Sequence, residues 1–191
     1  MGVAMADCLA EEGAEVDLIL GPSHVRPLHT RVALHPVHTA QDMHEKAVAL
    51  FPNSNGAIMS AAVSDYRPAQ QAAQKMKREA GVDLTLTLKP NPDIAASLGK
   101  MKQADQILVG FALETENEEA NALGKLKRKQ LDFIVLNSLK HEGAGFGGDT
   151  NRISILDKEG SKESFALKPK SEVARDIVDK LCRVMNGNNH S

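Results

Sequence analysis

The sequence predicts an α/β fold: a Rossmann-like, mostly parallel sheet in three layers, with a flap strand and a C-terminal antiparallel hairpin. Apolar runs of strand length alternate with amphipathic segments of helix length along the 191 residues, as in folds that cover a parallel sheet with helices. Only 3% of the residues are aromatic and there is no Trp. The core must therefore be aliphatic, which is typical of a parallel sheet buried on both faces.

Length and composition indicate one globular domain. We expect it to span residues 1–186, with a disordered tail over 187–191. The net charge of −2 does not favour a nucleic-acid surface or a membrane patch. The sequence shows neither a signal peptide nor an apolar run of about 18 residues, which favours the cytoplasm. Cys8 and Cys182 belong to no CxxC motif, so we interpret them as buried, reduced thiols.

The first fifty residues predict two helices and two strands. Helical spacing covers residues 2–12 and ends at Gly13, and Thr39 can cap a second helix over 40–50. The strands are expected at 15–20 and 31–37. A doubly wound sheet normally opens with a strand and a Gly-rich turn, so we expect such a strand and loop to be missing ahead of the first helix.

The rest of the chain is organised around residues 56–77. They begin as a strand that we predict to be buried on both faces through residue 62, and the strand breaks at Ser64-Asp65. Ligands of open α/β sheets bind beyond the carboxyl ends of strands. Small residues followed by Asp65 would let a ligand approach the backbone and would supply a carboxylate. For an isolated loop, a solvated Asp-Arg pair is the better interpretation.

The remaining elements follow in the same alternation. Residues 84–88 (LTLTL) alternate strictly and predict a half-exposed strand of a flap. Asn91 is expected to cap a helix, with Pro92 at its first position and Asp93 in its first turn. Further strands are predicted at 107–111 and 133–136, a helix at 116–129, a Gly-rich loop at 141–151, hairpin strands at 152–156 and 164–167, and a last helix capped by Ser171.

Three features can be interpreted as contacts for an anionic ligand, and each also has a simpler structural interpretation. Residues 75–78 (KMKR) could bind phosphate, or form a solvated loop. Lys125 and Lys129 share a helix face, which favours an anion between them or simply a basic last turn. Phe111 closes a strand, where it could stack on a base or belong to the core. The scattered histidines between 24 and 44 lack ligand spacing, so we predict no metal site there.

Six ordered motifs together resemble one family. They are AAVSDYRP (61–68), KMKR (75–78), KPNPDI (89–94), GFALET (110–115), KLKRKQLD (125–132) and FGGDTN (146–151). Their order and spacing over essentially the whole chain resemble phosphopantothenoylcysteine synthetase, usually the C-terminal half of a bifunctional bacterial coenzyme A biosynthesis protein. A plain Rossmann dehydrogenase is disfavoured, because no GxGxxG follows a strand.

The resemblance implies a two-step ligation. The carboxylate of 4′-phosphopantothenate attacks the α-phosphate of CTP, and cysteine then displaces CMP from the acyl-cytidylate. The resemblance further implies that Lys75 is the catalytic lysine of the first step. The implied nucleotide and substrate contacts are the backbone at Ala61 and Ala62, the Asp65 side chain, the turn Asn91, Pro92, Asp93, Ile94 and Ala95, the Phe111 ring, and Lys125 and Lys129 on the triphosphate.

The resemblance also implies the co-substrates and partners. Mg²⁺ would accompany the triphosphate without a dedicated protein cage, and the bacterial character of the motifs favours CTP over ATP. FMN is expected only if a decarboxylase half is present elsewhere, fused or separate. The alternating strand at 84–88 predicts a homodimer.

In that family the domain opens with a strand, a Gly-rich turn and an asparagine motif, of which Met1-Gly2 match only the end. We therefore expect a ligase whose activity depends on that segment. The alternative is a non-catalytic nucleotide-binding module or regulatory subunit with a synthetase-like fold.

Overall fold

The computed structural model describes residues 1–70, 72, 74–77, 83–114, 117–138 and 149–188. Its main sheet has five strands in the order β10-β9-β7-β6-β3. The inner strands β3, β6 and β7 are parallel, whereas β9 runs antiparallel to β7 and forms a hairpin with β10. This confirms the predicted mostly parallel sheet with a C-terminal antiparallel hairpin. The bounds are Gly56–Met59 (β3), Ile107–Glu114 (β6), Phe133–Ser138 (β7), Ile153–Asp157 (β9) and Lys162–Ser164 (β10).

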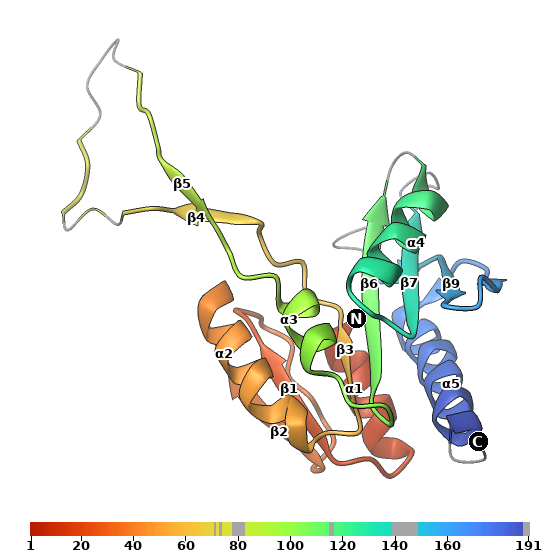
Figure 1. The fold of residues 1–191 in the computed structure, drawn as a ribbon. Coiled ribbons are helices and arrows are strands. Elements are labelled where there is room, and N and C mark those ends of the chain that lie inside the picture. The colour runs from red at the N-terminus through yellow and green to blue at the C-terminus, as the bar shows by residue number, and fades with distance from the viewer. Residues whose placement is uncertain (71, 73, 78–82, 115–116, 139–148, 189–191) are drawn as a thin grey trace.

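Three two-stranded sheets accompany the main one. Strands β1 (Val16–Leu20) and β2 (Val32–Pro36) pair in parallel, and they lie beyond β3, on the side away from β6 (Figure 1). The other two pairs are antiparallel: β4 (Tyr66–Pro68) with β5 (Leu88–Pro90), and β8 (Thr150–Asn151) with β11 (Lys168–Pro169).

Helices cover both faces of the sheet, which gives the predicted three layers. One face packs against α1 (Gly2–Glu11) and α5 (Lys170–Asn188). The opposite face packs against α2 (Ala40–Leu50), the short helix η1 (Phe51–Asn53), α3 (Ile94–Met101) and α4 (Glu118–Arg128). None of the helices in the described part of the chain is both long and apolar enough to cross a membrane.

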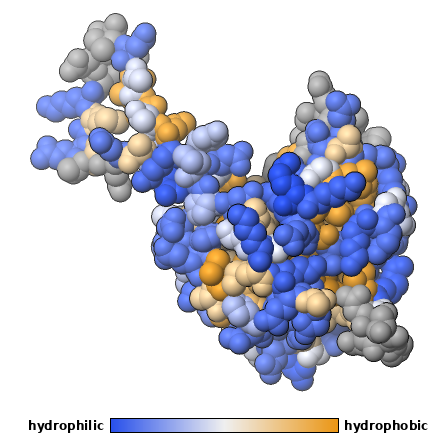
Figure 2. Space-filling model, viewed as in Figure 1, coloured by the Kyte–Doolittle hydropathy of each residue, from blue (hydrophilic) through white to orange (hydrophobic). Residues whose placement is uncertain are grey.

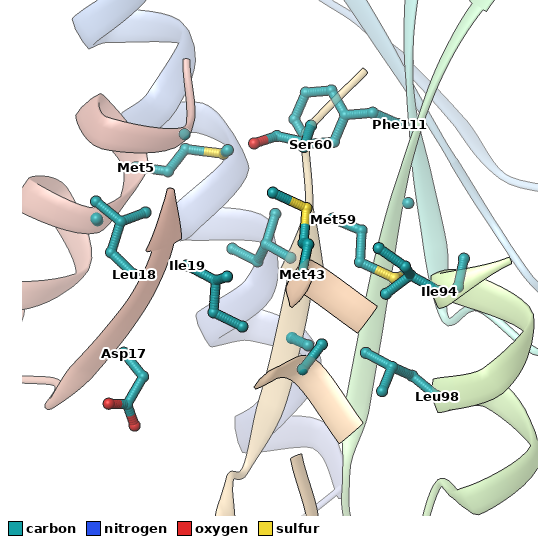
Figure 3. A pocket seen from close by; sticks show the side chains of 18 of the residues that line it. Met5, Asp17, Leu18, Ile19, Met43, Met59, Ser60, Ile94, Leu98 and Phe111 are labelled. Carbon is teal, nitrogen blue, oxygen red and sulfur yellow. The ribbon is translucent and has the colours of Figure 1, made fainter. Parts of the chain in front are cut away.

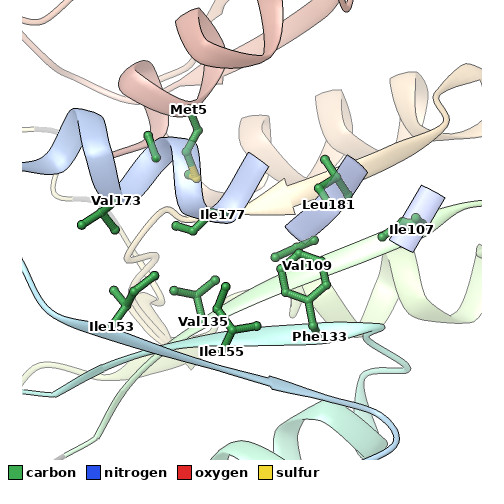
Figure 4. Packing of buried hydrophobic residues seen from close by; sticks show 11 residues of the cluster. Met5, Ile107, Val109, Phe133, Val135, Ile153, Ile155, Val173, Ile177 and Leu181 are labelled. Carbon is green, nitrogen blue, oxygen red and sulfur yellow. The ribbon is translucent and has the colours of Figure 1, made fainter. Parts of the chain in front are cut away.

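Side chains of successive residues in the inner strands pack alternately into the two cores, one on each face of the sheet. Val109 belongs to the core under α1 and α5, whereas its neighbour Leu108 belongs to the core under α2, α3 and α4. Both side chains are fully buried. This explains why these strands are apolar at every position. Figure 4 shows the first of these cores, in which side chains of the sheet point toward α5 and α1: Met5, Ile107, Val109, Phe133, Val135, Ile153, Ile155, Val173, Ile177 and Leu181.

Local signals in the sequence place several element boundaries correctly. Gly13 follows α1 with φ +96°, a backbone conformation that favours glycine. Thr39 caps α2: its side chain accepts a hydrogen bond of 3.0 Å from the Asp42 N–H, and the Asp42 carboxylate accepts one from the Thr39 N–H. This reciprocal pair satisfies two backbone donors at the start of the helix.

Two strand predictions need correction. All four residues of β3 are only half-buried, and Ala61 and Ala62 beyond it are exposed, because β3 is the edge strand of the main sheet. The predicted strand at 84–88 is shifted, since β5 begins at Leu88 and the preceding residues are extended but unpaired. Both strands differ from the prediction for the same reason: a sequence pattern records side chains, not whether a neighbouring strand is present.

Helix starts and the C-terminus also differ. Asp93, not Asn91, caps α3, so Pro92 precedes the helix. Ser171 lies inside α5, which begins one residue earlier, at Lys170. The same helix continues through Asn188, two residues into the stretch expected to be disordered. Asn91 and Asp93 are both common cap residues, and the Asp93 side chain is the one that accepts a hydrogen bond from the Ala96 N–H. The differences of one or two residues at the ends of α5 are ordinary for helix boundaries.

The pair β4–β5 forms the base of an arm that projects from the body of the molecule (Figure 1). The arm spans the described residues between β3 and α3. Orange groups are visible on the arm in Figure 2. The large side chains of the arm that are more than half exposed are Tyr66, Met76, Leu84, Leu86 and Leu88. The predicted flap is therefore present, and its apolar residues contact no core.

Candidate functional site

The site is a cavity of about 1200 Å³ between β1 and β3 that reaches the carboxyl ends of both strands and the middle of β6. Its inner part is apolar. In Figure 3, Met5 and Leu18 border it on one side and Met59 and Ile94 on the other. Ser60 and Phe111 stand at one end of it, which we call the mouth. The mouth lies where the parallel strands end, the position at which open α/β sheets bind ligands.

Most of the predicted site residues line this cavity, and the structure brings them together from four separate segments. The exceptions are Ala62, which is exposed outside the lining, and Lys75, which lies exposed on the arm. Those that line it are Ala61, Asp65, Asn91, Pro92, Asp93, Ile94, Ala95, Phe111, Lys125 and Lys129.

Asn91 fastens the loop after β3 instead of capping a helix. Its Nδ2 donates to the Ser64 carbonyl at 2.7 Å, and its backbone N–H donates to the Asp65 carbonyl at 2.8 Å. Its Oδ1 accepts from Arg67 Nη1 at 2.6 Å. These three bonds hold the backbone on both sides of Asp65, while the Asp65 carboxylate itself is left exposed at the cavity.

Asp93 joins two helices at the mouth. Its Oδ1 accepts from the Ala96 N–H at 3.0 Å and lies 3.1 Å from Lys129 Nζ. Burial raises the pKa of Asp93, but the hydrogen bonds from Ala96 and Lys129 outweigh it and hold the pKa below the usual aspartate value. The half-buried Lys129 ammonium is thereby held at the cavity by a carboxylate. Behind it, α3 packs so closely that a Cβ on Gly99 would lie 2.1 Å from the Lys129 carbonyl oxygen.

Two further residues that line the cavity were missed by the sequence analysis. They are Lys170 and Asp149, and the Lys170 N–H donates to the Asp149 carbonyl at 2.9 Å. Lys170 begins α5 directly after β11 and has no characteristic spacing to another motif. Asp149 was noted only as part of a family motif, and no sequence pattern connects the two residues.

The charges of the mouth suit an anion held beside polar groups. Lys125, Lys129 and Lys170 supply cations, and Lys127 and Arg128 lie outside the lining, as their helical positions predicted. Among the described residues, no three His, Cys, Asp or Glu side chains gather in a way that could hold a metal ion.

Three predicted motifs lie partly beyond the described residues. In the GFALET motif, Thr115 is outside them. In the KMKR cluster, Lys75 and Lys77 are exposed on the arm, and Arg78 is outside the described residues. In the FGGDTN motif the first three residues, 146–148, are outside them too, whereas Asp149, Thr150 and Asn151 are described.

The fold and the position of the cavity define a Rossmann-like α/β domain with its site at the carboxyl ends of parallel strands. The sequence profile of the DNA/pantothenate metabolism flavoprotein C-terminal domain matches residues 1–185, and the chain belongs to this family.

Two curated relatives and one solved structure illustrate the similarity. A cysteine/cysteine sulfinic acid decarboxylase from an unknown prokaryotic organism is 50% identical over 97% of this chain and 52% of its own length. The coenzyme A biosynthesis bifunctional protein CoaBC of Bacillus subtilis is 40% identical over 95% of this chain and 44% of its own length. The chain thus spans about half the length of these curated relatives. The crystal structure of a CoaBC C-terminal domain superposes with a TM-score of 0.81 at 33% identity, covering 97% of this chain and 82% of that one.

Proposed function

We propose that the chain is a phosphopantothenate–cysteine ligase domain of coenzyme A biosynthesis. The observation that carries the proposal is that Lys125, Lys129 and Lys170 line the same cavity as Asp65, beside the ends of parallel strands. Membership of the family and 40% identity to a CoaBC protein support the same activity. We place the protein in the cytoplasm, with CTP as its nucleotide.

The reaction has two steps that build negative charge on phosphate or acyl oxygens. An oxygen of the 4′-phosphopantothenate carboxylate attacks the α-phosphorus of CTP, and pyrophosphate leaves with the electrons of the broken P–O bond. The amine of cysteine then attacks the acyl carbon, CMP leaves, and the ammonium proton passes to solvent. Lys125 and Lys129 hold the triphosphate, and Mg²⁺ accompanies it on the phosphate oxygens. Phe111, in the middle of β6, borders the nucleotide, and Asp65 with the backbone at Ala61 and Ala62 orients it.

Lys75 acts from the arm. It is exposed and lies outside the cavity lining, so a site that uses it must be closed by the arm of one of two subunits. The exposed Leu84, Leu86 and Leu88 on the same arm support contact with a second copy, because apolar side chains in such number are rarely left in water. We therefore propose a homodimer in which Lys75 neutralises charge at the α-phosphate. FMN would belong to a decarboxylase part outside these residues.

Nucleotide binding tests the mouth. Lys125→Met and Lys129→Met should each weaken CTP binding by roughly 10- to 100-fold, the scale of a lost charge-assisted hydrogen bond, measured by isothermal titration calorimetry. Lys127→Met is the matched control, since Lys127 is exposed on the same helix and outside the lining. Equal affinities for all three variants would refute a triphosphate at this mouth.

The first chemical step tests Lys75. In a version that carries the family's opening strand, Gly-rich turn and asparagine motif ahead of Met1, pyrophosphate release with phosphopantothenate and CTP but no cysteine should fall by ~10²–10³ in Lys75→Gln, with CTP affinity unchanged within a few-fold. Lys77→Gln, two residues along the same exposed segment, should lose much less. CTP binding without any pyrophosphate release would instead favour the alternative, a non-catalytic nucleotide-binding module or regulatory subunit with this fold.

A further inference from the structure

Asp149 and Lys170 lie opposite each other at the end of a short antiparallel strand pair. The pairing of β8 with β11 ends with Thr150 opposite Pro169, and the next two residues continue this register by one position. The Lys170 N–H donates to the Asp149 carbonyl at 2.9 Å, which holds the two backbones side by side. Residues directly opposite in an antiparallel pair carry their side chains on the same face. Both residues line the cavity, so a carboxylate and an ammonium are presented to it together.

Neither of these two charges is neutralised by a neighbour. Among the described residues, no ion pair joins Lys170 or Asp149 to a partner or to each other. Elsewhere in the lining the opposite holds, since Lys129 Nζ lies 3.1 Å from the Asp93 carboxylate. An ammonium and a carboxylate that line one cavity without pairing are each available to a ligand.

This pair lies on a different side of the cavity from the lysines assigned to the triphosphate. Lys170 begins α5, which covers one face of the main sheet. Lys125 and Lys129 stand at the end of α4, which covers the opposite face. A second ligand can therefore be bound beside Lys170 while a triphosphate occupies the α4 side.

The carboxylate beside Lys170 decides which kind of ligand fits there. A phosphate would bring its negative charge against Asp149, which has no cation of its own, and like charges repel. A zwitterion that carries an ammonium and a carboxylate on the same carbon satisfies both side chains at once, with a charge-assisted hydrogen bond to each. This is the charge pattern of an α-amino acid.

We propose that Asp149 and Lys170 bind the amino-acid substrate of the second step, an inference that rests on the proposed ligase function. Lys170 holds the α-carboxylate of cysteine, and Asp149 holds its ammonium. The ammonium proton passes through the Asp149 carboxylate to solvent, which frees the electron pair of the amine. The amine attacks the acyl carbon, so that the C–N bond forms while the bond from that carbon to the phosphate oxygen breaks. CMP leaves with the electrons of that bond, and the second proton of the nitrogen passes to solvent.

Two thiol amines distinguish the two contacts. The assay follows amide formation in the version of the protein that carries the opening segment, supplied with phosphopantothenate and CTP. Lys170→Met should raise the KM for cysteine by roughly 10- to 100-fold, the scale of a lost charge-assisted hydrogen bond. For cysteamine, which lacks the carboxylate, the same substitution should leave kcat/KM unchanged. Asp149→Asn should lower kcat/KM for both amines by at least about tenfold, because both carry the ammonium.

Two controls separate this role from structural support and from nucleotide binding. Lys168→Met, two residues before Lys170 but outside the lining and paired with Asp176 at 2.6 Å, should leave the KM for cysteine unchanged. Pyrophosphate release without cysteine should be unchanged in Lys170→Met and Asp149→Asn. Equal losses with cysteine and cysteamine in Lys170→Met would overturn the proposal. So would a loss of pyrophosphate release with an unchanged KM for cysteine, because Lys170 would then hold the nucleotide.

A binding measurement keeps the test decisive if the protein forms no amide. The 191-residue chain is titrated with cysteine, and the backbone amides of Asp149 and Lys170 are followed by NMR. Cysteine should shift both amides, and Lys170→Met should raise the midpoint at the Asp149 amide by at least about tenfold. A parent protein that binds cysteine here but releases no pyrophosphate would refute the proposed ligase and support the amino-acid site. No shift at either amide would overturn the site, whatever the activity.

Discussion

Replacing Asp132 by Ala should destabilise the protein more than other single changes away from the cores. The Asp132 side chain is 4% exposed, and its Oδ2 accepts from Lys102 Nζ at 2.5 Å and from the Leu108 N–H at 2.7 Å. Its Oδ1 lies 3.4 Å from Lys158 Nζ. Asp132→Ala leaves the buried Leu108 N–H and the 15% exposed Lys102 ammonium without this partner. Breaking a buried ion pair on one side costs about 3–5 kcal/mol.

That loss corresponds to a fall in Tm of about 6–20 °C for a chain of this size. Urea denaturation followed by circular dichroism measures it. Asp132→Asn keeps an acceptor for the Leu108 N–H and should lose less, by roughly 1–2 kcal/mol. The exposed Asp105, changed to Ala, should stay within about 0.5 kcal/mol of the parent. A loss below about 1 kcal/mol for Asp132→Ala would refute the view that this carboxylate ties the start of β7 to β6.

Three further predictions concern the site and its supports. Gly99→Ala should lower the free energy of unfolding by about 1–3 kcal/mol, because its Cβ would press on the Lys129 carbonyl. Gly124→Ala, which has open space around it, should instead raise the free energy of unfolding by about 0.5–1 kcal/mol. The same urea titration measures both. Since the pKa of Asp93 is lowered by folding, its contribution to stability is present above about pH 4 and is lost as the pH falls through its folded value; Asp93→Asn should flatten that part of the stability-versus-pH curve. Thr39→Ala should cost about 1 kcal/mol, measured by thermal unfolding, and a neutral result would contradict the role of the capping box.

The sequence was most informative where one strand serves two cores. The runs at 107–111 and 133–136 are apolar at consecutive positions because their side chains alternate between two helical layers, and they form β6 and β7. The same signal at 56–62 overestimated burial, since β3 has the side chains of an inner strand and the position of an edge strand. Likewise, the alternation at 84–88 predicts an apolar face but does not say what covers it.

The site was predictable to the extent that its residues belong to motifs. Asp65, Phe111, Lys125 and Lys129 fall in quoted motifs, and all line the cavity. The roles of individual residues were harder to predict. Asn91 and Asp93 are both good cap residues, and the hydrogen bonds from Asn91 to the loop after β3 are long-range contacts. Lys170 was not predictable, because only the pairing of β8 with β11 brings it to the mouth beside Asp149. The predictions for Lys75 and for the homodimer remain open to the experiments above.

The packing of α1 against α5 has a consequence for the order in which the chain folds. Met5 shares a core with Ile177 and Leu181, which are separated from it by nearly the whole sequence. On the ribosome α1 emerges well before α5, so this face of the sheet stays open until α5 has been synthesised. Contacts between such distant residues form slowly. The apolar surface that stays exposed until then can bind chaperones or aggregate. The residues of α5 thus control a late step of folding for α1.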